Sequence, residues 1–171
     1  MNKKVLKKGI FFKSVNILTL KLKYAVLQYL LNLGIMNFMS QDHKKIITAF
    51  FEARESNDFN ALKKLCSSDI AWIIPGNNSV SGNYFRQDEV FGLFKKQSKS
   101  TGGTYRERLI DILTSEARTI AFGEMVGNRA GQDLETDFCM LFEFNKSSII
   151  TEVRVFTEYQ VLADEFWGSQ Q

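Results

Sequence analysis

Residues 134–144, LETDFCMLFEF, alternate between apolar and polar side chains with a period of two, which is typical of a β-strand with one buried face. One face of such a strand would carry Thr136, Phe138, Met140, Phe142 and Phe144, and the other Glu135, Asp137, Cys139, Leu141 and Glu143. The aromatic row predicts the core face of a sheet. The mixed row predicts an outer face, exposed to solvent or to a second subunit.

Three further strand-like runs lie on either side of this one, at 104–113, 118–127 and 149–158. Short turn-like stretches connect consecutive runs, and connections this short join antiparallel neighbours and exclude parallel crossovers. The second half of the chain therefore predicts a meander of four antiparallel strands.

Outside the meander, apolar residues recur at the spacing of amphipathic helices. We expect helices at 40–56 with Ser40 as N-cap, at about 59–66, at 87–99, and a last one from about residue 159. A strand at 69–74 ends at Pro75-Gly76, a turn signal. Helices segregated from an antiparallel sheet predict an α+β fold.

The N-terminal segment differs from the rest in charge. Residues 1–38 hold seven Lys and no acidic residue, whereas residues 39–171 hold 15 basic and 19 acidic residues, a net charge of −4. We therefore expect an extension at 1–38 outside a domain at 39–171. Two interpretations of the extension stay open: peripheral contact with an anionic membrane, or a true start of the chain at Met36 or Met39.

Composition limits the chemistry and the partners of the domain. A mildly acidic body argues against nucleic-acid binding, because phosphate recognition needs a basic face. The only histidine, His43, is expected to be exposed, and with Cys66 and Cys139 far apart in sequence it gives no metal site. No cofactor is expected. The two cysteines could form one disulfide, but nothing in their spacing demands it. Two buried free thiols are the preferred interpretation; they predict a reducing compartment, and we therefore expect a cytoplasmic protein.

Five segments, taken together, resemble one family. They are IITAFFEARESNDFNALKKLCSSDIAW (46–72), PGNNSVSGNYF (75–85), QDEVFGLFKK (87–96), GGTYRERLIDIL (102–113) and VFTEYQVLADEFWG (155–168). Their order and character are similar to those of the SnoaL-like branch of the nuclear transport factor 2-like superfamily, over nearly all of the acidic body.

This resemblance implies a cone, in which a strongly curved sheet wraps against helices and opens at one end to an apolar pocket. It also implies a homodimer formed through the sheet, and a small apolar molecule as ligand. The function implied is less specific, because the fold hosts cofactor-independent isomerases, cyclases and hydrolases as well as non-catalytic ligand-binding or dimerisation modules.

Ketosteroid isomerisation is the best-understood chemistry of the superfamily, and it needs a hydroxyl, a carboxylate base and a protonated acid. By local resemblance, the corresponding positions in this chain are Phe50, Ile74 and Met140. None of these side chains can donate the hydrogen bond that an oxyanion needs or accept a proton. That mechanism is therefore not expected.

Glu124 is the acidic residue with the strongest case for catalysis. Its neighbours on one face of the predicted strand are Ile120, Phe122 and Val126, and burial among them would raise the pKa of the carboxyl toward that of a general acid or base. Two alternatives remain: this row lies at the rim, or Glu124 pairs with a cross-strand Arg such as Arg108 or Arg154.

The pocket wall is expected to combine the apolar positions above with aromatic residues that carry a polar tip. The residues expected to line the pocket are Phe50, Trp72, Tyr84, Phe122, Phe138, Met140 and Tyr159. Plain core packing is the alternative role for any of them, and for Trp72 in particular.

Overall fold

The structure is a computed structural model that describes residues 35–115 and 118–168, with side chains described from residue 42 onward. The chain divides into two compact units, Met1–Met39 and Ser40–Gln171. Of the first unit, only the helical backbone of residues 35–39 is described. The expected extension at 1–38 and its membrane contact therefore lie almost entirely outside the described residues.

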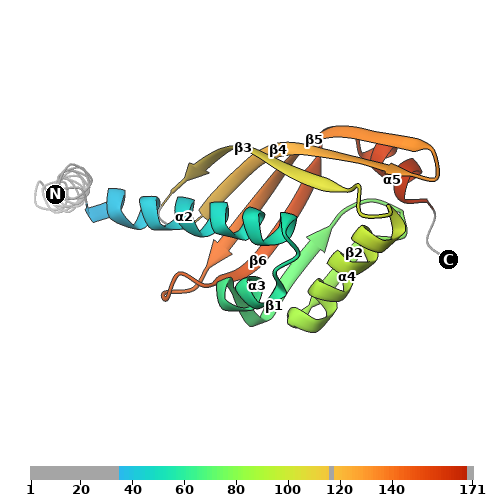
Figure 1. The fold of residues 1–171 in the computed structure, drawn as a ribbon. Helices are drawn as coiled ribbons and strands as arrows, with labels where there is room; N and C mark the ends of the chain where they lie inside the picture. Colours follow the sequence, from blue (N-terminus) through green and yellow to red (C-terminus); the bar gives the residue numbers. More distant parts are fainter. Residues whose placement is uncertain (1–34, 116–117, 169–171) are drawn as a thin grey trace, which may run out of the picture. The chain divides into compact units, whose positions relative to one another are not determined.

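The second unit holds a sheet and the helices that pack on it (Figure 1). In chain order the described elements are α2 (Ile35–Glu55), α3 (Phe59–Leu65), β1 (Cys66–Ile74), β2 (Gly82–Phe85), α4 (Arg86–Ser100), β3 (Arg106–Thr114), β4 (Arg118–Arg129), β5 (Gln132–Phe144), β6 (Ile150–Thr157) and α5 (Gln160–Trp167). None of the described helices is long and apolar enough to cross a bilayer.

The six strands form one curved, mixed sheet in the order β2-β1-β6-β5-β4-β3. All neighbours are antiparallel except β1 and β6, which run parallel. The expected α+β class and the antiparallel meander of β3 to β6 are confirmed. The parallel pair was not foreseen, because β1 and β6 lie far apart in the sequence and no short connection joins them.

The core lies between the inner face of the sheet and the helices. Phe50 of α2 is at its centre, with ring-centroid distances of 5.8 Å to Trp72 of β1, 5.7 Å to Phe142 of β5 and 6.5 Å to Phe94 of α4. Alternate residues of β5 from Leu134 to Phe142 are buried on this face, as the period of two predicts. The other face of the sheet, called the outer face below, carries the mixed row.

Two local expectations are wrong. Helix α2 begins at Ile35, so Ser40 lies inside the helix instead of capping it; neither Pro nor Gly occurs between Ile35 and Glu55. Strand β2 was missed, because four residues are too few to establish a period.

His43 is buried, which corrects the expectation of an exposed imidazole. It is 3% exposed and stacks on Phe144 with a centroid distance of 4.0 Å and an interplanar angle of 6°. Burial lowers the pKa of the imidazole, although the nearby Asp42 carboxylate partly opposes this effect. The Nδ1 atom has no hydrogen-bond partner among the described residues.

The two cysteines are free thiols, as expected. Cys66 is buried, and burial raises the pKa of its thiol to about 12. Because the thiolate is the reactive form of cysteine, Cys66 is an unreactive core residue at neutral pH.

Candidate functional site

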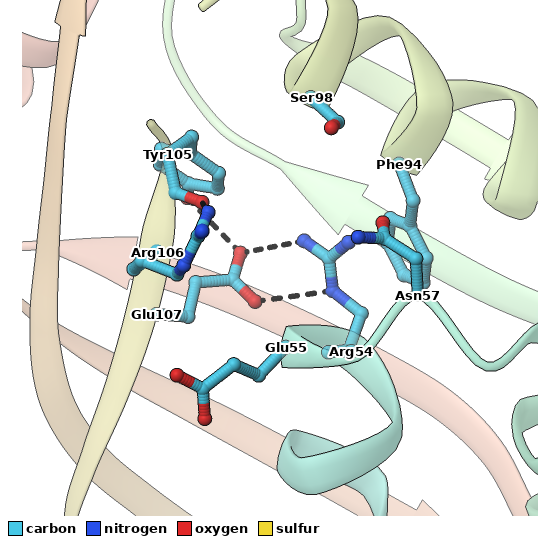
Figure 2. Close-up of a pocket in the computed structure, with 8 residues that line it drawn as sticks. All are labelled: Arg54, Glu55, Asn57, Phe94, Ser98, Tyr105, Arg106 and Glu107. Atoms are coloured by element: carbon cyan, nitrogen blue, oxygen red, sulfur yellow. Dashed lines mark hydrogen bonds and ion pairs between the residues drawn. The ribbon is translucent and has the colours of Figure 1, made fainter. Parts of the chain in front are cut away.

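Four polar side chains meet inside the fold, where α2 ends and β3 begins; they are called the interior polar cluster and comprise Arg54, Gln97, Tyr105 and Glu107. Figure 2 draws three of them, Arg54, Tyr105 and Glu107. The guanidinium of Arg54 donates to both Glu107 carboxylate oxygens, from Nε at 3.2 Å and from Nη2 at 3.1 Å. Nη2 also donates to Gln97 Oε1 at 3.2 Å. The two charged side chains are only 9% and 4% exposed.

The four members of the cluster come from α2, from α4 and from the start of β3. Arg54 lies in the last turn of α2, where a cation also complements the negative end of the helix. Gln97 is on the buried face of α4. Tyr105 and Glu107, two residues apart at the start of β3, point to the same side, and Tyr105 Oη donates to Glu107 Oε1 at 3.0 Å.

The surroundings of Tyr105 keep its hydroxyl protonated. Burial, together with the nearby Glu107 carboxylate, raises the pKa of Tyr105 well above its usual value, so its hydroxyl stays a hydrogen-bond donor. Arg54 also lies over the Phe94 ring, 3.6 Å from its centroid. The Glu107 carboxylate thus accepts three hydrogen bonds from within the chain and faces a cation, which opposes its use as a proton carrier.

Two small cavities adjoin the cluster. One lies beside Arg54 and Glu55 and has a volume of about 30 Å³. The second, called the inner cavity below, has a volume of about 20 Å³. A cavity of this size has room for about one water molecule.

The inner cavity has a polar end and apolar walls. Gln97, Tyr105 and Glu107 form the polar end. The apolar part of the lining is formed by Trp72, Ile74, Val80, Met125, Val155 and Trp167, and the polar residues Asn78, Thr157 and Gln160 also line the cavity. Within residues 42–115 and 118–168, Gln97 Nε2 donates to no partner, so this amide is the donor still available at the polar end.

The loop at 75–81 and α5 close the inner cavity from one side. Asp164 of α5 accepts from the Asn77 amide at 3.1 Å, from Asn78 Nδ2 at 2.6 Å and from Gln160 Nε2 at 2.9 Å. Partial burial raises the pKa of the Asp164 carboxyl, but these hydrogen bonds outweigh it and the pKa lies below its usual value. Ser79 Oγ adds a hydrogen bond to the Trp167 carbonyl at 2.7 Å.

Of the residues expected to line the pocket, Trp72 is the one that lines the inner cavity. Phe50, Phe138 and Met140 face the interior, but they are fully packed in the core. Tyr84 lies on the edge strand β2, where its hydroxyl donates to the Val80 carbonyl at 3.0 Å. Tyr159 precedes α5 and is 58% exposed, so it lies outside the cavity.

Glu124 and Phe122 lie on the outer face of the sheet, which corrects the expectation that their row of β4 lines the interior. The residues of β4 that are buried on the inner face are Thr119, Ala121, Gly123 and Met125, so the intervening row faces outward. Glu124 pairs with Arg108 at 3.8 Å and its side chain is 37% exposed. The ion-pair alternative is therefore the one observed, and the desolvation on which a catalytic role depended is absent.

Sequence reasoning did not single out Arg54, Gln97, Tyr105 or Glu107. A signal was available in part, because Tyr105 and Glu107 are polar residues on alternate positions of a strand expected to have a core face. Arg54, however, lies 43 residues from Gln97 and 53 residues from Glu107 in the sequence, and no local pattern pairs residues that far apart. Among the described residues, no group of three His, Cys, Asp or Glu side chains could hold a metal ion.

No protein-family model and no curated protein sequence matches the chain, but solved structures do. Bal32a, from a soil-derived mobile gene cassette, is 25% identical, covers 75% of this chain and 98% of its own length, and superposes with a TM-score of 0.73. A protein of unknown function with a cystatin-like fold from Xanthomonas campestris is 27% identical, with coverages of 74% and 98% and a TM-score of 0.69.

A structure from Jannaschia sp. CCS1, described as a SnoaL-like polyketide cyclase, is 11% identical, with coverages of 75% and 92% and a TM-score of 0.62. Structures described as nuclear transport factor 2-like proteins also match. Likeness at such low identity concerns the fold alone. At that level the resemblance expected from the sequence is confirmed.

Proposed function

We propose, from the nuclear transport factor 2-like fold of this chain, that it binds a small apolar molecule with one hydrogen-bond acceptor, such as a ketone, in the inner cavity. The observation that carries the proposal is the free Gln97 amide at the polar end of a cavity with apolar walls. Ligand sites in proteins commonly combine apolar walls with a few placed polar groups. A carbonyl oxygen would accept from Gln97 Nε2 while the apolar body contacts Trp72, Met125 and Trp167.

A ligand of more than a few atoms can enter the inner cavity only if α5 and the loop at 75–81 move apart. The inner cavity has a volume of about 20 Å³. The side chains that close it, Gln160 and Trp167, belong to α5, and Asp164 ties this helix to the loop at 75–81. We therefore expect ligand affinity to rise when these hydrogen bonds are weakened, because less free energy is spent on opening.

A binding module fits the cluster better than an enzyme does. The one carboxylate at the cavity, Glu107, is held by Arg54 and Tyr105 and is a poor general base. The isomerase, cyclase or hydrolase alternative is tested by incubating the protein with cyclohexanone in deuterated buffer. We expect no deuterium uptake above the buffer rate; uptake that Glu107→Gln abolishes and Glu124→Gln does not would establish proton-transfer catalysis.

Binding itself is tested by nuclear magnetic resonance of the indole N–H groups. The chain has two tryptophans, Trp72 and Trp167, and both line the inner cavity. We expect both indole signals to shift on titration with cyclohexanone and much less with cyclohexane, and Gln97→Met to weaken cyclohexanone binding roughly fivefold, the loss of one hydrogen bond.

Two substitutions on one helix provide a matched pair for this titration. Ala163→Leu fills the cavity and should abolish the shifts, because Ala163 lines it, whereas Val161→Leu on the exposed side of α5 should leave them unchanged. Equal shifts of the indole signals in Ala163→Leu and in Val161→Leu would contradict the proposed location of the ligand.

We also propose that a second copy of this chain covers the outer face. The supporting observation is that Leu113, Phe122 and Phe156, 56%, 37% and 50% exposed, lie on this face, where Leu113 pairs with Ile120 of β4 and Phe156 pairs with Cys139 of β5. Its arginines already pair within the chain, Arg108 with Glu124, Arg118 with Glu143 and Arg154 with Glu152. The apolar side chains are therefore available for contact, together with the exposed acidic side chains of Glu135 and Asp137.

Sedimentation velocity tests the homodimer. We expect a dimer at micromolar concentration, a monomer after Phe122→Asp or Phe156→Asp, and an unchanged dimer after Val161→Asp, which places the same charge on α5. A monomeric unsubstituted protein at tens of micromolar would refute this part of the proposal.

A cytoplasmic location is likewise proposed. It is supported by the two free thiols, which a reducing compartment preserves. Cell fractionation, followed by detection of the protein in the soluble fraction and in the membrane pellet, tests both this location and the expected peripheral contact through residues 1–38.

A further inference from the structure

A groove lies on the surface between α3 and α4, away from the inner cavity and from the outer face. Its volume is about 480 Å³, and Phe59 and Lys63 of α3 face Arg86, Phe91 and Lys95 of α4 across it. Volumes of about 300–1,000 Å³ are usual for small-molecule sites. The groove is thus large enough for a ligand without any movement of the fold, unlike the inner cavity.

Two aromatic rings form the floor of the groove. The centroids of Phe59 and Phe91 are 5.8 Å apart, and the rings are tilted by 53°. Phe91 is buried, while Phe59 is partly exposed at the groove. A flat apolar body can pack on this floor, and contact between aromatic rings adds to the free energy of area burial.

Cations dominate the rim. Lys63, Arg86 and Lys95 line the groove together with one acidic residue, Asp88. Asp88 is paired with Arg86 at 2.7 Å. Lys95 Nζ lies 4.9 Å from the Phe59 ring centroid, and Lys63 has no acidic partner among the described residues. The groove therefore carries a net positive charge in a domain whose sequence is net negative.

Gln87, which lines the groove as Ser68 also does, helps to fix its shape. Gln87 Nε2 donates to the carbonyl oxygens of Lys63 at 3.1 Å and Cys66 at 2.9 Å, which joins the start of α4 to the end of α3. These carbonyls are at the helix end that lacks intrahelical partners, so the two walls of the groove are held together.

From this combination we infer that the groove between α3 and α4 is a second binding site, and that its ligand is an aromatic carboxylate. The aromatic body packs on Phe59 and Phe91, and the carboxylate lies between the ammonium groups of Lys63 and Lys95, where Coulomb attraction favours it. The inference does not depend on the function proposed for the inner cavity, because the two sites share no lining residue.

Titration of the ¹⁵N-labelled full chain with 1-naphthoate tests the site. We expect amide shifts concentrated in Phe59–Leu65 and Arg86–Ser100, and at least tenfold weaker binding of neutral 1-naphthylmethanol. Lys63→Gln/Lys95→Gln should weaken naphthoate binding roughly fivefold to tenfold, since each exposed ion pair is worth a modest factor. The matched control is Lys64→Gln/Lys99→Gln, which removes two exposed lysines of the same helices that do not line the groove.

A third variant predicts the opposite sign. Asp88→Asn removes the one carboxylate of the groove and frees Arg86, so it should tighten naphthoate binding roughly twofold or more. Shifts that map to other elements, equal affinities for naphthoate and naphthylmethanol, or equal effects of the groove and control variants would each overturn the inference. Because all substituted side chains are exposed, unchanged unfolding midpoints should accompany these effects.

Discussion

Replacing Glu107 with leucine tests whether the interior polar cluster behaves as one buried unit. The substitution leaves the Arg54 guanidinium without either of its carboxylate partners, at a site where that side chain is 9% exposed. It also leaves the Tyr105 hydroxyl without its acceptor. The reverse variant, Arg54→Leu, leaves the Glu107 carboxylate without its cation and the Gln97 side-chain carbonyl without its donor. Each single substitution therefore leaves one largely buried charge without its partner.

The magnitude follows from the geometry. Removing one partner of a buried ion pair costs about 3–5 kcal/mol, because the other charge remains buried and unpaired. The double variant Arg54→Leu/Glu107→Leu buries no charge, and its two stranded hydrogen-bonding groups cost about 1 kcal/mol each. We expect the double variant to lose about 2 kcal/mol, far less than the two single variants combined, with a coupling energy of at least about 3 kcal/mol.

Urea unfolding of the four proteins at one pH, followed by tryptophan fluorescence, measures this cycle. The single variants should also melt roughly 10 °C below the unsubstituted protein. Additive effects, or single variants that lose less than about 1 kcal/mol, would refute the description of Arg54 and Glu107 as a desolvated pair.

Three further predictions follow from particular positions. Burial lowers the pKa of His43 below its ordinary 6.5. The stability that the neutral imidazole contributes is therefore fully present above pH 6.5 and is lost as the pH falls, so urea midpoints between about pH 7.5 and pH 5 should decline less for His43→Phe than for the unsubstituted protein. Equal declines of the two midpoints with pH would contradict the burial effect. Gly123→Ala places a Cβ against the Arg108 carbonyl oxygen and 2.6 Å from the Phe138 ring, so it should lower the free energy of unfolding by about 2 kcal/mol or more. Gly92→Ala adds a Cβ with nothing within 4 Å at an exposed helix position, so it should raise the free energy of unfolding by about 0.5–1 kcal/mol. Chemical unfolding that gives the two variants the same stability would be inconsistent with the packing. A chain beginning at Met39 should keep a cooperative transition close to that of the full chain, because the core residues all belong to the second unit; a large drop in its calorimetric midpoint would show that residues 1–38 contribute to the domain.

The sequence predicted those parts of the fold that local periodicity controls. The period of two in β5 identified both faces of the strand, and Phe138, Met140 and Phe142 are buried as expected. The same reasoning failed for β4, where Ile120, Phe122 and Val126 made the outward row look like the core row. Small residues, Ala121 and Gly123, occupy the inner row instead, because Gly123 leaves room for the Phe138 ring.

The candidate site was largely beyond prediction because it is assembled by tertiary contacts. Arg54 lies in the last turn of one helix and Gln97 on another, while Tyr105 and Glu107 lie just before and just inside the start of a strand. Their pairing therefore depends on how the helices pack on the sheet. The misplacement of Glu124 has the same origin: its ion pair with Arg108 depends on the register of β3 against β4, which also contains a bulge. Trp72 was expected at the pocket wall or in the core, and it lines the inner cavity; its contact with a ligand stays a prediction.

Intermolecular nuclear Overhauser effects between cyclohexanone and labelled methionine methyl groups test the central claim most directly, because they locate the ligand. Of the five methionines in the chain, Met125 lines the inner cavity and Met140 is packed in the core. Binding in the inner cavity predicts cross-peaks from the ligand to the Met125 methyl and the Gln97 side-chain amide, which Ala163→Leu removes. Cross-peaks that appear only with side chains of the outer face, or that persist in the cavity-filling variant, would contradict the account.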